Sequence, residues 1–214
     1  MIFDLDGVLV DSEVWWQDVR VAFAAEHGRT WDESDQATVM GANSLGWART
    51  MRERLAIDLS ETEIIDAVVG AVVARFHRDG PPAIPGAVEA ARRIAAERPV
   101  AVASSAHRAV IDVALASTGL AEVIGVVVSS DEVAHGKPAP DVYLEAARQL
   151  GVQPATCLVV EDSMNGVRAG VAAGMTVVLV PNEAVPPAAG THELADVVLE
   201  RLADLDPAAV VAAR

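Results

Sequence analysis

Residues 1–12 read MIFDLDGVLVDS, and the rest of the chain is organised around this stretch. A short apolar run leads into Asp4, and Asp6 follows two residues later, directly before Gly7. In an extended strand, residues i and i+2 point to the same face, so Asp4 and Asp6 are predicted to lie side by side at a buried strand end. Two carboxylates this close share a proton or hold a cation between them. The alternative is a polar strand end that caps a loop.

The composition limits the classes of partner. The chain has 214 residues, of which 52% are hydrophobic, and its formal net charge is −15. This length allows one large domain or a core with a smaller module. The charge disfavours nucleic acid and anionic membranes as partners, and no apolar run approaches the roughly 18 residues of a membrane helix. It also repels a phosphorylated metabolite, so a phosphate site requires locally concentrated positive charge.

Cysteine content and the start of the chain predict the compartment. The single cysteine, Cys157, excludes a disulfide within the chain, and the motif at residues 1–12 leaves no room for a signal peptide. We therefore expect a cytoplasmic protein. We also expect a monomer or a small homo-oligomer.

The pattern after the first motif predicts two structural parts. Residues 13–79 carry helical patterns only, including Ser60 with Glu63 three residues on, the spacing of a capping box. The segment 79–86, DGPPAIPG, ends this helical region. Beyond it, helices alternate with apolar strands predicted at residues 100–103, 126–128, 157–160 and 176–180, with a last apolar segment at 196–199.

Such strands indicate a parallel sheet that is covered by helices on both faces. The expected fold class is α/β, a Rossmann-like doubly wound parallel sheet with an inserted α-helical domain. The predicted core domain comprises residues 1–12 and 80–214, and the predicted inserted domain comprises residues 13–79. Ligands of such sheets bind at the carboxyl ends of the strands.

Polar residues follow two of these strands in a pattern that suits phosphate. Ser104 and Ser105 come after the second strand, where hydroxyl and backbone N–H groups at a helix start can bind an anion, although a helix cap explains Ser104 equally well. Lys137, the only lysine, lies in a proline-flanked turn after the third strand. A solvated surface charge is its alternative interpretation.

Two adjacent acids, Glu161 and Asp162, follow the fourth strand. Acids that decorate a helix N-terminus are the alternative. Together with Asp4 and Asp6 across the crevice, they would form a set of hard oxygen ligands of the kind that Mg²⁺ prefers. The sequence thus predicts a magnesium site beside a phosphate site.

These motifs, in this order, resemble those of the haloacid dehalogenase (HAD) superfamily. The run DLDGVLVDS at 4–12 is the most specific of them, and Ser104, the segment GKPAPD at 136–141 and the pair Glu161–Asp162 match the other three. A helical insert directly after the first motif is similar to the C1 cap of the beta-phosphoglucomutase/phosphatase-like subgroup. The resemblance implies a Mg²⁺-dependent phosphatase that acts on a small phosphorylated metabolite of the sugar or polyol phosphate class.

The resemblance also implies a role for each matching residue. Asp4 is expected to attack phosphorus and become an aspartyl phosphate, while Asp6 serves as general acid and then as general base. The expected phosphate-binding residues are Ser104, Ser105 and Lys137, with a Lys–Pro peptide that is often cis in the family. The expected metal-binding residues are Asp4, Asp6 through its backbone carbonyl, Asp162, and Glu161 in the outer shell.

Other activities on the same fold require residues that differ from those in this sequence. Haloacid dehalogenation needs neither Asp6 nor the later acids, and phosphonoacetaldehyde hydrolysis needs a cap lysine, which this chain lacks. The main alternative is a sugar-phosphate mutase of the beta-phosphoglucomutase type, whose members have a His on the first cap helix and an Arg shortly after a cap glycine. Neither stands at 14–17 or directly after Gly41 here, although Arg49 lies further on. A non-catalytic binding protein is a second alternative.

All four tryptophans lie in the predicted cap, at positions 15, 16, 31 and 47. The simpler interpretation is a small hydrophobic core of the cap itself. The alternative is that Trp16 and Trp47, with Arg49, face the cleft and select an apolar or cyclic substrate body.

Overall fold

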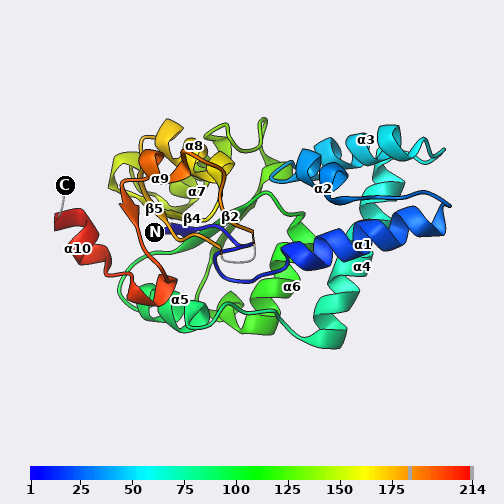
Figure 1. Ribbon diagram of the computed structural model, residues 1–214. Helices are drawn as coiled ribbons and strands as arrows, with labels where there is room; N and C mark the ends of the chain where they lie inside the picture. The colour runs from blue at the N-terminus through cyan, green and yellow to red at the C-terminus, as the bar shows by residue number, and fades with distance from the viewer. Residues whose placement is uncertain (183–184, 213–214) are drawn as a thin grey trace.

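The computed structural model describes residues 1–182 and 185–212, and their centre is a sheet of six parallel strands (Figure 1). The strand order is β3-β2-β1-β4-β5-β6, the order of a doubly wound Rossmann sheet, so the predicted fold class is confirmed. The strands are β1 (Ile2–Phe3), β2 (Ala101–Ser104), β3 (Val126–Ser129), β4 (Leu158–Glu161), β5 (Thr176–Leu179) and β6 (Val197–Val198).

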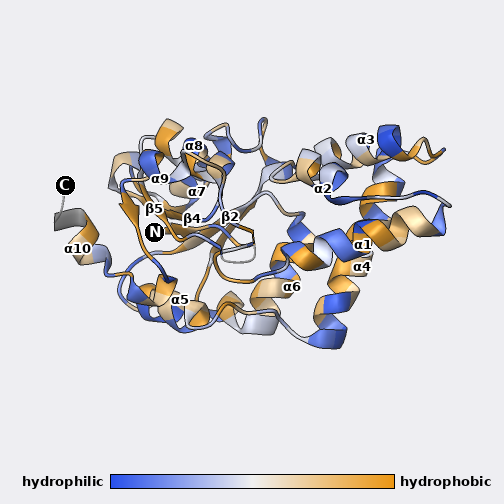
Figure 2. Ribbon diagram, in the orientation of Figure 1, coloured by the Kyte–Doolittle hydropathy of each residue, from blue (hydrophilic) through white to orange (hydrophobic). Residues whose placement is uncertain are grey.

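Both faces of the sheet are buried because the strand side chains alternate between two apolar layers. Phe3, Val102 and Val160 pack into the cluster that includes α5 (Ala87–Ala95) and α6 (Arg108–Thr118). Their neighbours Ile2, Ala101 and Val159 pack into the cluster that includes α7 (Asp141–Leu150) and part of α8 (Met164–Ala172). Figure 2 shows the strands as predominantly hydrophobic, whereas the helices carry both hydrophobic and hydrophilic residues. Continuous apolar runs are thus the pattern of a sheet covered on both sides.

The strand order locates the crevice of the fold. β1 pairs with β2 on one side and with β4 on the other, so the chain leaves the central strand in both directions. In such a sheet the ligand site lies beyond the carboxyl ends of the strands at this point. Asp4, which follows β1 directly, continues the pairing through its N–H, which donates to the carbonyl oxygen of Val160 at 2.9 Å.

Between β1 and α5 the chain forms four further helices, which lie to one side of the sheet (Figure 1). They are α1 (Glu13–Glu26), α2 (Glu33–Val39), α3 (Ser44–Leu55) and α4 (Glu61–Asp79). The sequence analysis omitted α2, which begins with a capping box between Asp32 and Asp35. That Asp-x-x-Asp spacing was a usable signal. Two short helices near the C-terminus, α9 (Thr191–Leu194) and α10 (Pro207–Ala212), complete the described structure.

The inserted helices contact the sheet-bearing part at two separated places. The two connecting segments run side by side, since the N–H of Asp11 donates to the carbonyl of Pro82 at 2.8 Å. At the start of α3, the N–H and the hydroxyl of Ser44 donate to the two carboxylate oxygens of Asp131, at 2.8 and 2.5 Å. Hydrogen bonds therefore fix the inserted helices both at their connecting segments and at the loop after β3.

No helix of residues 1–182 and 185–212 combines sufficient length with sufficient apolar character to cross a bilayer.

Candidate active site

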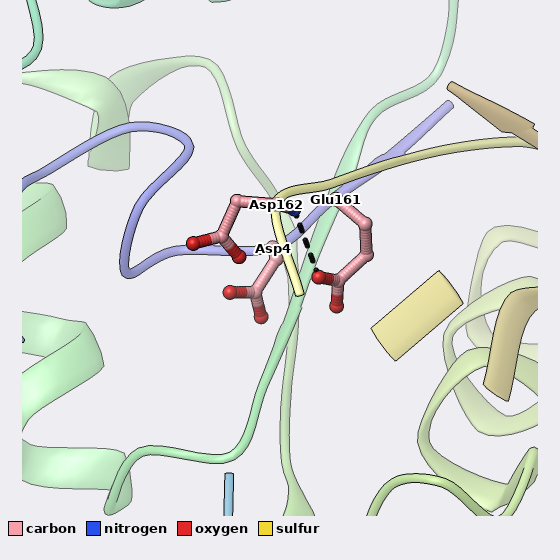
Figure 3. A group of neighbouring side chains, drawn as sticks. All are labelled: Asp4, Glu161 and Asp162. Carbon is pink, nitrogen blue, oxygen red and sulfur yellow. Dashed lines mark hydrogen bonds between the residues drawn. The ribbon is translucent and has the colours of Figure 1, made fainter. Parts of the chain in front are cut away.

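Three carboxylates meet at the carboxyl ends of β1 and β4. Asp4, Glu161 and Asp162 each place one oxygen within 4.8 Å of the others, and all three residues are buried (Figure 3). Burial and mutual repulsion raise the pKa of Asp162 well above its usual value, because Glu161 and Asp4 are its nearest charges. The first and fourth motifs of the sequence are thus brought together by the neighbouring strands β1 and β4.

Lys137 partly neutralises this cluster. Its Nζ donates to Oδ1 of Asp4 and to Oε1 of Glu161, both at 2.6 Å. Burial opposes the charge of the lysine, but the two carboxylates raise its pKa above the usual value. The Lys137–Pro138 peptide bond is cis. The lysine therefore remains charged and fixed beside Asp4, with its ammonium group at the centre of the site.

Both oxygens of Glu161 are occupied by protein groups. Oε1 also accepts from the hydroxyl of Tyr143 at 2.6 Å, while Oε2 accepts from the backbone N–H groups of Asp162 and Ser163, at 3.0 and 3.1 Å. Although burial alone would raise its pKa, Lys137 and these hydrogen bonds hold the pKa of Glu161 below its usual value. Glu161 is consequently a fixed anion that orients Lys137.

Asp162 is held differently from Glu161. Within residues 1–182 and 185–212 its carboxylate accepts no hydrogen bond and forms no ion pair. Gly7, at φ +79°, allows the first loop to pass directly beside it, since a Cβ on Gly7 would lie 1.9 Å from Oδ2 of Asp162. Asp4 and Asp162 thus offer hard carboxylate oxygens whose ionised form a bound cation would stabilise. This donor set fits Mg²⁺.

Asp6 lies on the other side of Gly7 and has one fixed oxygen. The hydroxyl of Ser12 donates to Oδ1 of Asp6. Burial, with a smaller contribution from the Glu13 carboxylate, raises the pKa of Asp6 to about 7. The carboxyl of Asp6 can therefore both hold and release a proton near neutral pH.

Two serines lie at the end of β2, which flanks β1 on the side away from β4. Ser104 is buried, and its hydroxyl oxygen accepts from the N–H of Ala106 at 3.1 Å, which leaves its own proton to donate. The hydroxyl of Ser105 is buried and has no hydrogen-bond partner in the described part of the chain. A buried hydroxyl without a partner costs free energy unless a ligand binds it. The arrangement suits the oxygens of a bound phosphate.

These residues open onto a cavity of about 450 Å³ between the sheet and the inserted helices. Of the residues selected from the sequence, those that line it are Asp4, Asp6, Ser104, Ser105, Lys137, Asp162, Trp16 and Trp47. Glu161 lies behind the lining and contacts it through Lys137. Arg49 is exposed on α3 and does not line the cavity, so the structure does not bring it into the site.

The two tryptophans lie mostly beneath the surface of this cavity. Trp16 is 5% exposed and Trp47 is 2% exposed, and their ring centroids are 6.2 Å apart in an edge-on arrangement. Trp47 lies within α3 rather than on a loop. Each therefore exposes little surface to the cavity, and packing accounts for most of its surface.

Two cavity residues, Glu13 and Arg20, were missed in the sequence analysis. With Trp16 they are spaced by three and four residues on α1, which places all three on one face of the helix. The signal was available, because a charged residue at each end of a helical stripe is unusual for a packed face. A search for apolar periodicity alone does not detect it.

The chain matches a protein-family model and is similar in sequence to known phosphatases. The family model described as haloacid dehalogenase-like hydrolase matches residues 1–174. The chain is 31% identical to the fructose-1-phosphate phosphatase YqaB of Escherichia coli over 83% of this chain and 94% of that protein. It is 34% identical to a bifunctional riboflavin kinase/FMN phosphatase of Arabidopsis thaliana over 96% of this chain, but spans only 54% of that longer protein.

A solved structure extends the similarity to three dimensions. CbbY from Rhodobacter sphaeroides in complex with phosphate superposes with a TM-score of 0.84, at 25% sequence identity. The superposition covers 99% of this chain and 97% of that chain, so it includes both the sheet and the inserted helices.

Proposed function

Since the chain belongs to the haloacid dehalogenase-like hydrolases, a family with phosphate-ester-cleaving relatives, we propose that it is a Mg²⁺-dependent phosphatase. The proposed substrate is a small phosphorylated metabolite of the sugar or polyol phosphate class, and the proposed compartment is the cytoplasm. The observation that carries this proposal is the position of Asp4. Its carboxylate accepts a hydrogen bond from the ammonium group of Lys137 and has an oxygen within 4.8 Å of an Asp162 oxygen, in a cavity that Ser104 and Ser105 also line.

Asp4 is the proposed nucleophile. Lys137 holds one of its oxygens, which leaves the other to attack phosphorus. The new bond joins this oxygen to phosphorus, and the bond from phosphorus to the alcohol oxygen of the substrate breaks. The leaving alkoxide takes a proton from Asp6, and the product of the step is an aspartyl phosphate on Asp4 plus the free alcohol.

Hydrolysis of this intermediate uses the same two residues in reverse. Asp6, now ionised, accepts a proton from a water molecule, whose oxygen attacks phosphorus, and the bond from phosphorus to Asp4 breaks. A pKa near 7 suits a group that must give and regain a proton in one cycle. The hydroxyl of Ser12 keeps the carboxyl of Asp6 in one orientation during both steps.

The charge on the transferred group has to be neutralised within a strongly acidic chain. In this proposal Lys137 and the hydroxyls of Ser104 and Ser105, which line the cavity, bind its non-bridging oxygens. Asp4, Asp162 and the backbone carbonyl of Asp6 would hold Mg²⁺, with Glu161 in the outer shell. When bound, the ion would supply Lewis-acid stabilisation of the phosphoryl charge.

The test is Mg²⁺-dependent phosphate release from a panel of phosphomonoesters, with Asp4→Asn as the inactive control. The panel comprises hexose phosphates, polyol phosphates, phosphoglycolate, nucleotides and p-nitrophenyl phosphate, and beta-glucose 1-phosphate is also assayed for isomerisation. We expect release that requires Mg²⁺ and is lost in Asp4→Asn. Isomerisation without phosphate release would instead establish the mutase alternative, and binding without turnover of any panel member would indicate a non-catalytic protein.

A further inference from the structure

Arg20 of α1 is a buried arginine without an ion pair. It is 5% exposed, and no carboxylate of residues 1–182 or 185–212 lies within salt-bridge distance of its guanidinium group. Buried arginines are normally paired, because an unpaired charge in the protein interior costs free energy. Burial accordingly lowers the pKa of Arg20 to about 10, against the opposing effect of the nearby acids. The described residues thus bury the Arg20 cation without supplying a carboxylate within ion-pair distance.

The guanidinium group is nevertheless held in a definite place. Its Cζ lies 5.1 Å from the ring centroid of Trp16 and 5.3 Å from that of Trp47, within the range of cation–π contacts. Nη1 donates to Oε1 of Gln36 at 3.1 Å, and the same oxygen accepts from the indole of Trp31 at 3.2 Å. The two tryptophans of the cavity wall therefore position an arginine rather than present free stacking faces.

Most donors of Arg20 remain unused. The contact with Gln36 is the only hydrogen bond of its guanidinium group in the described structure, and the buried Nε has no partner there. Arg20 also lines the cavity. An arginine fork with free donors matches the geometry of a carboxylate or phosphate.

The charges of the cavity wall are divided along α1. Arg20 and Lys137 are the two cationic side chains among the described lining residues, and Lys137 is already bound to Asp4 and Glu161. Glu13, at the start of α1, lies beside the core acids, whereas Arg20 follows seven residues later, about 10 Å along the helix axis. In Figure 1, α1 extends away from the sheet, so its later turns lie farther from the strand ends than its first turn.

We propose that Arg20 binds a second oxyanion of the substrate, at the end of the molecule opposite the transferred phosphate. The preferred substrates would then be compact phosphate esters that also carry a carboxylate or a second phosphate. This inference rests on the proposed phosphatase function and narrows its substrate class. It also assigns a role to the tryptophans, which is to hold the guanidinium group in place.

Matched substrate pairs test the proposal. In one pair, 3-phosphoglycerate is compared with glycerol 3-phosphate, which replaces the carboxylate by a hydroxymethyl group. In the other, ribulose 1,5-bisphosphate is compared with ribulose 5-phosphate. We expect a preference of about 10- to 100-fold in kcat/KM for the member with the second oxyanion in at least one pair, as charged hydrogen bonds provide. Which pair shows it distinguishes a carboxylate from a phosphate.

The decisive variant is Arg20→Met, with Arg20→Lys as a charge-retaining companion. Arg20→Met should remove the preference, and Arg20→Lys should retain part of it. The matched control is Arg75→Met, which also removes a cap arginine stacked on a tryptophan (Trp15, at 4.8 Å) but lies outside the cavity. This control should change both members of each pair equally. Thermal unfolding of all variants identifies any loss of folding.

Two results would overturn the inference. In the first, wild type shows no higher kcat/KM for the member with the second oxyanion in either pair. In the second, Arg20→Met changes kcat/KM equally for both members of each pair. Hydrolysis of p-nitrophenyl phosphate that Asp4→Asn abolishes would leave the proposed phosphatase function standing in either case. If no compound is hydrolysed, the proposed function fails, and dissociation constants of the same pairs in the Asp4→Asn background still decide the role of Arg20.

Discussion

Replacing Asp162 by Asn should stabilise the metal-free protein. The oxygen of Asp162 in the acidic cluster lies within 4.8 Å of oxygens of both Asp4 and Glu161. At an effective dielectric constant of about 20, two like charges at this separation repel by about 3.5 kcal/mol, and Lys137 offsets roughly one of the two repulsions. Protonation of Asp162, whose pKa burial raises, relieves part of the remainder. We therefore expect a gain of about 2 kcal/mol, or about 4–8 °C in Tm for a chain of this length.

The pH dependence of this gain follows from the raised pKa of Asp162. Below about pH 4 the carboxyl is protonated in both the folded and the unfolded wild-type chain, so the variant has no electrostatic advantage. Above that pH the unfolded chain releases a proton that the folded protein retains, and the stability of the wild type falls as pH rises. The difference in Tm between Asp162→Asn and wild type should thus increase from pH 4 towards neutrality.

Addition of Mg²⁺ should make wild type more stable than Asp162→Asn. At a concentration 100-fold above its dissociation constant, a ligand that binds only the folded state stabilises it by about 2.7 kcal/mol. Wild type should gain this stability in thermal unfolding, and Asp162→Asn should gain little. Asp112→Asn, which removes an exposed carboxylate paired with Arg108, is the control and should show neither effect. An apo Asp162→Asn protein that is less stable than wild type, with an undiminished response to Mg²⁺, would refute the reasoning.

Two further substitutions test how the site is assembled. Ser12→Ala removes the hydrogen bond that lowers the pKa of Asp6. The kcat–pH profile should therefore shift to higher pH, and kcat at neutral pH should fall by about 10-fold. An unchanged profile would count against this role of Ser12. Gly166→Ala places a Cβ 1.7 Å from Oε1 of Glu161, so we expect loss of stability and at least a 100-fold lower kcat. Its control, Gly70→Ala in α4, meets no atom within 4 Å and should raise stability by about 1 kcal/mol with unchanged activity; equal behaviour of the two glycine variants would contradict the argument.

Much of the fold was predictable because the sheet is covered on both faces. A doubly covered strand needs a continuous apolar run, and such runs at β2 to β5 were recognisable without any tertiary information. The helix α2 was missed because its seven residues carry little apolar periodicity, and its capping box is formed by two aspartates rather than by Ser and Glu. Short polar helices depend on capping and tertiary contacts more than on pattern.

The core of the candidate site was also predictable, whereas its cap side was not. Asp4, Asp6, Ser104, Ser105, Lys137 and Asp162 were selectable because each directly follows a strand, and parallel strands bring their carboxyl ends to one edge. The cap residues come from helices, whose orientation towards the cavity depends on packing. Arg49 was therefore selected although it faces solvent, and Arg20 was overlooked although it faces the cavity.

Strand periodicity and local spacing were sufficient to predict the α/β class, the order of the four motifs and the chemical type of each core residue. The distribution of charges, in contrast, depends on the tertiary structure. That structure paired Lys137 with Asp4 and Glu161, left the Asp162 carboxylate without a partner among the described residues, and buried Arg20 against two tryptophans. The physical reason is that burial and pairing depend on distances between residues far apart in the chain, which local sequence patterns do not encode.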